Sequence, residues 1–176
     1  MDNLHIRPAQ PTDIPALLDV ITRAYRSTGG WTTEADLIDG SRTSPQLLQD
    51  DLSNPLVVLF VAEQGEQLLG CAKVSQIAPG VCDFGLFAVD PNTQSRGLGK
   101  LLLAHGEQVA LTQFAAHTLE IQVLEHRPEL VAFYERRGFA PTGEWELFDF
   151  DDAAFGRAKR PGLRFQTFRK ALSPQP

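Results

Sequence analysis

A short glycine-containing segment is a candidate anion-binding turn. The sequence from Asp90 to Lys100, DPNTQSRGLGK, places glycines at 97 and 99 where an apolar strand pattern ends and a helical pattern begins. Glycine has no Cβ, so backbone N–H groups there can approach a ligand closely. These amides would lie at the positive end of a helix dipole, and Arg96 and Lys100 add positive charge at the rim. The segment therefore predicts binding of phosphate groups.

Three phosphate-binding motifs can be compared with this turn. A Walker A loop requires glycine at 94 and Ser or Thr at 101, where the chain has Gln94 and Leu101. A dinucleotide fingerprint requires glycine at 102, where the chain has Leu102. The pattern Q/R-x-x-G-x-G/A is met by Gln94, Gly97 and Gly99. On these residues alone, a glycine turn that only opens a helix remains the alternative.

Two neighbouring segments strengthen the motif. Residues 83–91, DFGLFAVDP, precede the turn, and residues 133–139, FYERRGF, follow it. In this order the three segments resemble the fourth strand, the pyrophosphate loop and the FYxxxGF helix end of the GNAT superfamily of N-acetyltransferases. The resemblance covers the chain from Leu4 to Leu172 and is specific over about 80–140.

The resemblance implies an enzyme that transfers an acetyl group from acetyl-CoA directly to a primary amine of a small molecule or a protein N-terminus. In this family the fourth and fifth strands splay apart, and the pantetheine arm pairs with the fourth strand, where an amide near Val89 would polarise the thioester carbonyl. The implied cofactor contacts are Phe87, Ala88, Val89, Gln94, Ser95, Arg96, Gly97, Leu98, Gly99 and Lys100. A catalytically silent acyl-CoA-binding or sensing domain is the second interpretation.

Asp83 and Tyr134 are the catalytic residues that the resemblance implies. A lysine-like amine has a pKa of about 10.4, so it must lose a proton before it attacks. The family often places an acid, acting through water, at the position of Asp83, and a phenol that protonates the departing thiolate at the position of Tyr134. A solvated strand carboxylate and a core tyrosine are the respective alternatives.

The acceptor side is less clearly marked. The family binds its acceptor between segments that correspond to residues 27–42 and 149–162, and the candidate contacts are Trp31, Asp36 and Asp149. Acidic and aromatic groups suit a cationic amine, although a short helix with a solvated acidic face is the alternative. The family's usual asparagine is replaced by Arg127, a poor N-cap that could instead pair with a phosphate.

Composition restricts the function classes. The chain has 176 residues, 43% of them hydrophobic, and a net charge of −6, which suits one domain over residues 1–176 and argues against a nucleic-acid partner. The longest apolar run, Leu56 to Ala62, is far too short to cross a bilayer, and the N-terminus lacks a signal-peptide pattern. A cytoplasmic protein without a membrane partner is therefore expected, and the family resemblance makes a homodimer a candidate assembly.

No metal is expected. The two cysteines, Cys71 and Cys82, lie in apolar stretches, and no Cys/His spacing suits zinc. An adjacent carboxylate, Asp83, would raise the pKa of the Cys82 thiol, so an acetylated cysteine is disfavoured and direct transfer is preferred.

Hydrophobic periodicity predicts the elements that must position these residues, in the order β-α-α-β-β-β-α-β-α-β-β. Strands are expected at 4–7, 56–63, 68–77, 81–89, 118–124, 139–150 and 163–170, and helices from Thr12 to the glycines at 29–30, at 44–52, 97–114 and 128–137, with a further short helix at 33–39. This pattern predicts an α+β fold. Together with the family resemblance, the pattern predicts a GNAT-like mixed central sheet, mostly antiparallel with one central parallel pair. Helices are expected on both faces of this sheet, and its fourth and fifth strands are expected to splay apart.

Overall fold

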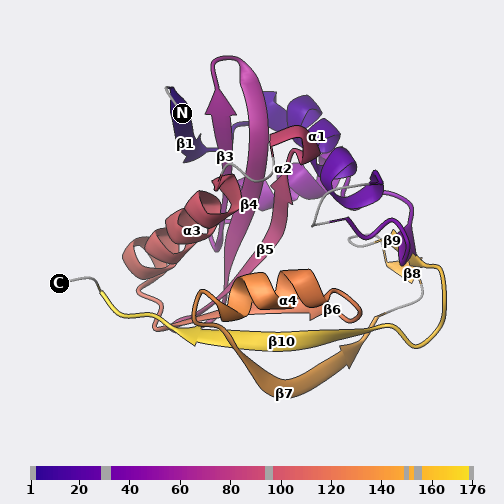
Figure 1. Ribbon diagram of the computed structural model, residues 1–176. Coiled ribbons are helices and arrows are strands. Elements are labelled where there is room, and N and C mark those ends of the chain that lie inside the picture. Colours follow the sequence, from indigo (N-terminus) through magenta and orange to yellow (C-terminus); the bar gives the residue numbers. More distant parts are fainter. Residues whose placement is uncertain (1–2, 29–32, 94–96, 149–150, 153–155, 175–176) are drawn as a thin grey trace.

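A seven-stranded mixed sheet organises the protein (Figure 1). The computed structural model describes residues 3–28, 33–93, 97–148, 151–152 and 156–174. In spatial order the strands are β1 (Leu4–Pro8), β3 (Val57–Gln64), β4 (Gln67–Ala78), β5 (Val81–Val89), β6 (Thr118–Leu124), β10 (Arg164–Ala171) and β7 (Ala140–Leu147). Neighbouring strands run antiparallel except β5 and β6, which form the parallel pair. The predicted fold class is confirmed.

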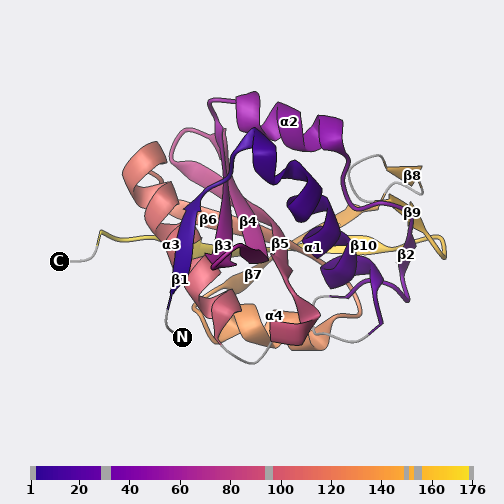
Figure 2. The same ribbon diagram turned by 90° about the horizontal axis from the view of Figure 1, so that it is seen from above.

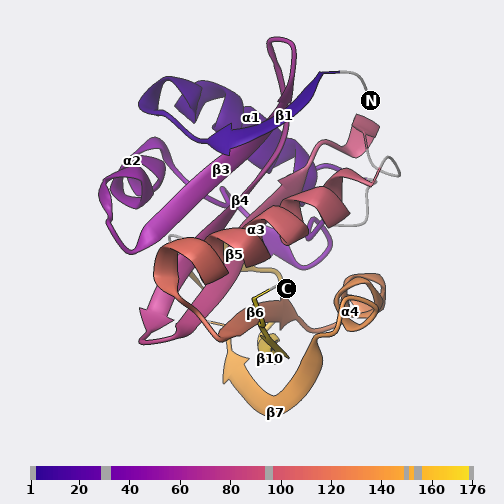
Figure 3. The same ribbon diagram turned by 90° about the vertical axis from the view of Figure 1, so that its left-hand side faces the viewer.

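Helices cover both faces of the sheet (Figure 2, Figure 3). They are α1 (Ile14–Arg26), α2 (Pro45–Ser53), α3 (Leu98–Phe114) and α4 (Pro128–Glu135). The alternation of strand side chains assigns them to faces. Leu59 and Val61 of β3 pack with residues of α1 and α2, whereas Phe60 and Ala62 pack in the cluster that contains residues of α3 and α4.

Local sequence accounts for the ends of several helices. Ser44 caps α2 by accepting a hydrogen bond from the Leu47 N–H at 3.2 Å, and Pro45 occupies the first helical position. At the start of α3, Gly97 adopts a left-handed conformation with a φ of 76°. The chain can therefore turn sharply from β5 into α3, as a glycine allows at little cost.

The predicted short helix at 33–39 is wrong. The structure has turns there, followed by the strand β2 (Ile38–Asp39), which joins β9 (Gly156–Ala158) and β8 (Asp151–Asp152) in a second, three-stranded sheet. Ile38 is buried with Leu124 and Phe165, so long-range packing overrides the local helical spacing.

Candidate active site

The parallel strands β5 and β6 separate soon after they begin to pair. Their register consists of three residue pairs and ends where Asp83 faces Glu120. Beyond this point both strands continue, but the structure gives no further pairing between residues 84–89 and 121–124. In Figure 1, β6, β10 and β7 accordingly run across the direction of β3, β4 and β5. This leaves the β6 side of β5 open to a ligand that can pair with its backbone.

A β-bulge in β5 shapes the same region. Lys73 of β4 faces Gly85, but Cys71 faces Ala88, so β5 contains one extra residue between these pairs. Leu86 lies there with a φ of 47°, a left-handed conformation that is uncommon for leucine. The Tyr25 hydroxyl, from α1, donates a hydrogen bond of 2.8 Å to the Phe87 carbonyl and so helps to fix the bulge.

A cavity of about 350 Å³ opens between the separated strands. Its walls include Asp83 and Phe87 of β5, Tyr25 of α1 and Tyr134 of α4. The two proposed catalytic side chains, 51 positions apart in the sequence, therefore line one cavity. The sequence did not indicate the contribution of Tyr25, because a tyrosine on the apolar side of a helix is usually a core residue.

The environment of Asp83 makes its carboxyl group unusually basic. Burial raises its pKa from 3.8 to about 6, and Glu120 adds to the rise. The charges of Lys73 and Arg42 oppose this shift. A carboxylate with such a pKa is ionised at neutral pH and accepts a proton more readily than an exposed aspartate does.

Tyr134 lies in an aromatic cluster and is only 5% exposed. Its ring packs edge-on against Phe133 and Phe139, with centroid distances of 5.3 and 5.5 Å. Burial raises the pKa of the phenol far above its usual value, while the charge of Arg127 acts in the opposite direction. Tyr134 therefore keeps its proton at any physiological pH and can act as a donor to a group in the cavity.

Comparison with known proteins identifies the family. Residues 17–139 match the model of the acetyltransferase (GNAT) family. The chain belongs to the GNAT family of acetyltransferases. The matched segment of this acetyltransferase includes β5, the glycine turn, α3 and the Tyr134 motif, which are the features that the sequence singled out.

Solved structures of other acetyltransferases have the same fold. The ribosomal-protein-S18-alanine N-acetyltransferase from Escherichia coli is 18% identical, with a TM-score of 0.72 over 98% of this chain and 96% of that chain. A ribosomal-protein-alanine N-acetyltransferase from Brucella melitensis is 20% identical, with a TM-score of 0.70 over 96% and 99%. A spermidine/spermine N-acetyltransferase from Vibrio cholerae is 16% identical, with a TM-score of 0.68 over 96% and 92%. No curated protein sequence matches the chain.

The structure describes part of the predicted cofactor site of this acetyltransferase. Phe87, Ala88 and Val89 are buried at the end of β5, and the glycine turn follows. Gly97 is exposed and a Cβ there would meet nothing within 4 Å, Leu98 and Gly99 are buried in the first turn of α3, and Lys100 is exposed. Gln94, Ser95 and Arg96 lie outside the described residues, so their cofactor contacts stay predictions.

An ion pair between a half-buried arginine and a buried carboxylate anchors the end of β5. Arg23 of α1 approaches the Asp90 carboxylate to 2.5 Å, and Asp90 also accepts a hydrogen bond of 2.9 Å from the Asn92 N–H. Asp90 is fully buried. The strand end from which the glycine turn departs therefore has a fixed position.

The two segments predicted to flank the acceptor lie side by side. Strand β2, from the first segment, pairs with β9, from the second, and the Lys159 N–H donates to the Leu37 carbonyl at 2.9 Å. Of the predicted contacts, Asp36 is exposed and is not among the described residues that line the cavity. Trp31 and Asp149 lie outside the described residues. All three stay predictions.

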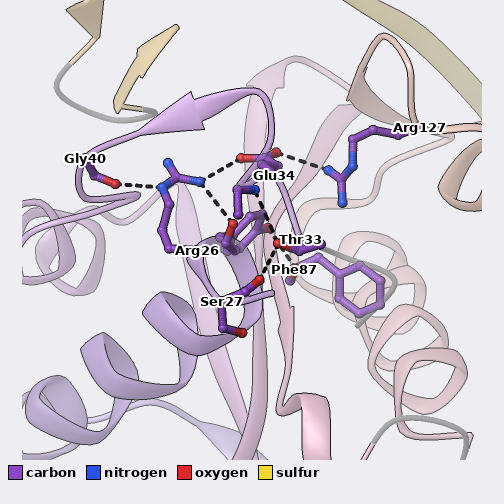
Figure 4. Close-up of polar contacts among 9 residues, drawn as sticks. Arg26, Ser27, Thr33, Glu34, Gly40, Phe87 and Arg127 are labelled. Carbon is purple, nitrogen blue, oxygen red and sulfur yellow. Dashed lines mark hydrogen bonds and ion pairs between the residues drawn. The ribbon is translucent and has the colours of Figure 1, made fainter. Parts of the chain in front are cut away.

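The predicted acceptor side contains a charged cluster whose contacts the sequence did not indicate. Glu34, buried among its neighbours, lies between Arg26 of α1 and Arg127, the residue before α4 (Figure 4). The Arg127 guanidinium bonds to Glu34 through Nη1, and the hypothesis that Arg127 pairs with a phosphate stays a prediction. Glu34 and Arg127 are 93 positions apart, and no motif connects them.

Metal binding and membrane crossing each have a specific structural requirement. Among the described residues, no group of three or more His, Cys, Asp and Glu side chains is arranged to hold a metal ion. Within the same part of the chain, no helix has both the length and the apolar character that a membrane crossing requires.

Proposed function

We propose that this acetyltransferase moves the acetyl group of acetyl-CoA directly to a primary amine of a small molecule or a protein N-terminus. The observation that carries the proposal is the single cavity between the separated strands, whose walls contain both Asp83 and Tyr134. One residue can accept a proton and the other can donate one, as acyl transfer from a thioester to an amine requires.

Asp83 acts on the attacking amine, and Tyr134 acts on the departing thiolate. As the amine nitrogen bonds to the carbonyl carbon, the carboxylate of Asp83 accepts the proton that the amine loses, directly or through water. As the carbon–sulfur bond breaks, the Tyr134 hydroxyl gives its proton to the departing thiolate. A proton then passes from Asp83 to the phenolate through solvent. The products are an N-acetyl amine and the CoA thiol, and both side chains return to their starting states.

The end of β5 is the proposed site for the carbonyl oxygen. We expect a backbone N–H near Val89, on the side of β5 that has no pairing with β6 beyond Asp83, to donate to the negative charge that develops on this oxygen. Fixed amide donors stabilise such an oxyanion without reorganising during the reaction. The Tyr25 hydrogen bond to Phe87 holds the strand in this conformation.

Removal of one hydroxyl group tests the assignment of Tyr134. Tyr134→Phe should lower kcat by about 100-fold or more, because the thiolate must then leave without a positioned acid. The measurement is steady-state acetylation of a panel of primary amines with acetyl-CoA, together with circular dichroism of each variant.

The matched control is Tyr25→Phe, since Tyr25 is the only other tyrosine in the chain and lines the same cavity. Its hydroxyl is engaged with Phe87, so kcat should fall by less than about 10-fold. Equal losses in both variants, or full activity of Tyr134→Phe, would remove Tyr134 from the mechanism. Binding of acetyl-CoA by the wild type without acetylation of any amine would favour the acyl-CoA-sensing interpretation.

A further inference from the structure

A buried carboxylate on the acceptor side is shared by two guanidinium groups. The Glu34 Oε2 atom lies 3.1 Å from Nη1 of Arg26, and its Oε1 atom lies 3.1 Å from Nη1 of Arg127. All three side chains are at most 11% exposed. Figure 4 shows the two arginines reaching Glu34 from opposite sides. One negative charge thus faces two positive charges, and the cluster as a whole has an excess of one positive charge.

The second terminal nitrogen of Arg127 is without a partner. Its Nη2 atom is buried and makes no hydrogen bond with any described residue. The side chain is 92% buried, and in Figure 4 this nitrogen points away from Glu34. A buried charged donor without an acceptor is unfavourable, so this position is suited to an anionic group from outside the chain.

Arg127 belongs to the same cavity as the proposed catalytic residues. Glu34, Arg42, Lys73 and Arg127 line its walls together with Asp83. Glu34 already has two arginine partners. The Lys73 ammonium is paired with the Asp51 carboxylate at 2.9 Å. Burial raises the pKa values of the phenols Tyr25 and Tyr134, and the charge of Arg127 opposes this shift, so its field extends into the cavity.

We infer that the acceptor amine also carries a carboxylate, which the free edge of the Arg127 guanidinium binds, so that the substrate class is a small amino acid rather than a polyamine. Guanidinium is suited to planar carboxylates, and Glu34 holds Arg127 in place for this contact. The cavity is small for a ligand site and has apolar walls at Leu130 and Phe165, which fits an apolar amino-acid side chain. The inference rests on the proposed acetyl transfer to an amine.

The test compares amines that differ only in the carboxylate. L-leucine is compared with 3-methylbutylamine and L-phenylalanine with 2-phenylethylamine, with spermidine as the polyamine, in steady-state acetylation by the wild type. We expect kcat/KM to be about 10-fold or more higher for each amino acid than for its decarboxylated counterpart. Arg127→Gln should reduce this preference to less than about 3-fold, while Arg127→Lys should retain part of it.

The control is Arg160→Gln, which removes an exposed arginine that is not among the described cavity residues and should leave the preference unchanged. If Arg127→Gln does not fold, the double variant Arg127→Gln/Glu34→Gln removes opposite charges together and should show the same loss of preference. Thermal denaturation checks the fold of each variant.

The possible outcomes separate the two proposals. If the decarboxylated amines or spermidine are acetylated as well as the amino acids, the inference about the carboxylate is wrong and the proposed acetyl transfer stands. If the protein binds acetyl-CoA but acetylates none of these amines, the proposed function fails for this panel. Calorimetry then compares the affinities of the protein for L-leucine and for 3-methylbutylamine. Tighter binding of L-leucine supports the inference about the carboxylate, and equal affinities or tighter binding of 3-methylbutylamine overturn it.

Discussion

The chemistry of Asp83 depends on where β5 and β6 part. The residue occupies the last position of β5 that pairs with β6, so its partly buried carboxyl group lies at the closed end of the opening and lines the cavity. Burial raises its pKa to about 6. This position gives Asp83 the basicity that its proposed role in amine deprotonation requires, because an aspartate in water would be a much weaker base.

This burial should make the protein less stable at high pH. The folded-state pKa of Asp83 is raised from 3.8 to about 6, so the folded state holds this proton more tightly than the unfolded chain does. The corresponding stabilisation is complete below pH of about 4 and is lost as the pH rises through about 6. Asp83→Asn removes the ionisation, and its free energy of unfolding relative to wild type should increase by about 2–3 kcal/mol between pH 4 and pH 7.5.

Urea denaturation of both proteins at several pH values measures this difference. A difference that does not change with pH would show that Asp83 has an ordinary pKa in the folded state, and the argument for an unusually basic carboxylate would then be lost.

At the residue scale the sequence indicated Asp83 and Tyr134 because each belongs to a short local motif. It did not indicate the contacts of Glu34 with Arg26, in α1, and with Arg127, the residue before α4. Arg127 was recognised as a departure from the family pattern, but its partner could not be found without the fold. Charge pairs over long sequence separations carry no local signature.

At the scale of elements, one glycine determines how closely α3 approaches β5. A Cβ on Gly106 would come within 2.7 and 2.8 Å of two ring atoms of Phe84. Phe84 lines the cavity from β5, so the packing of α3 supports one wall of the site. Helix α3 thus begins at the glycine turn and, near its middle, packs against a residue of the cavity wall.

Gly106→Ala should therefore destabilise the protein, although alanine is the better helix former by about 1 kcal/mol. Displacement of the Phe84 ring should cost about 1–3 kcal/mol, and urea denaturation should therefore show a net loss of up to about 2 kcal/mol. Gln108→Ala, at an exposed position of the same helix, should change the free energy of unfolding by less than about 0.5 kcal/mol. A Gly106→Ala protein more stable than wild type would contradict the close packing.

The success of element prediction followed the strength of the local pattern. Strand β6 was predicted at 118–124 and found there, because its apolar side chains alternate and Leu119, Ile121 and Val123 are buried. The segment 33–39 has helix-like spacing, yet Ile38 pairs with Ala158 in a strand. The bulge at Leu86 also escaped prediction, since a left-handed leucine is fixed by its tertiary surroundings.

At the scale of the whole molecule, the small β2-β9-β8 sheet links segments about 120 residues apart. Gly156, in β9, has a φ of 98°, and a Cβ there would overlap the Asp39 carbonyl oxygen and lie 3.0 Å from Ile38 Cγ2. The same Cβ would lie 3.1 Å from a guanidinium nitrogen of Arg26, which pairs with Glu34. The close contact of the two segments thus extends to the charged cluster of the acceptor side.

Gly156→Ala should separate β2 from β9 and weaken acceptor binding. We expect the KM for the amine to rise by about 10-fold or more, because the groups proposed to position the acceptor are displaced, while the KM for acetyl-CoA changes by less than about 2-fold. Gly162→Ala is the matched control, since Gly162 is also left-handed, with a φ of 80°, but a Cβ there would meet nothing within 4 Å. Similar effects of both substitutions on the amine KM would show that backbone strain, and not the β2–β9 contact, is responsible.

The three-residue pairing of β5 with β6 also gives the molecule a mechanical character. The seven strands form two parts of one sheet, the first ending in β5 and the second beginning with β6. A ladder of three residue pairs joins the two parts at one end. Opening or closing the free ends would break none of the β5–β6 ladder hydrogen bonds, so this motion is opposed by side-chain packing, by the Glu34–Arg127 ion pair and by the β2–β9 pairing. The short ladder is thus placed as the pivot of a hinge that ends at Asp83, and the contacts that oppose its opening lie away from the pivot.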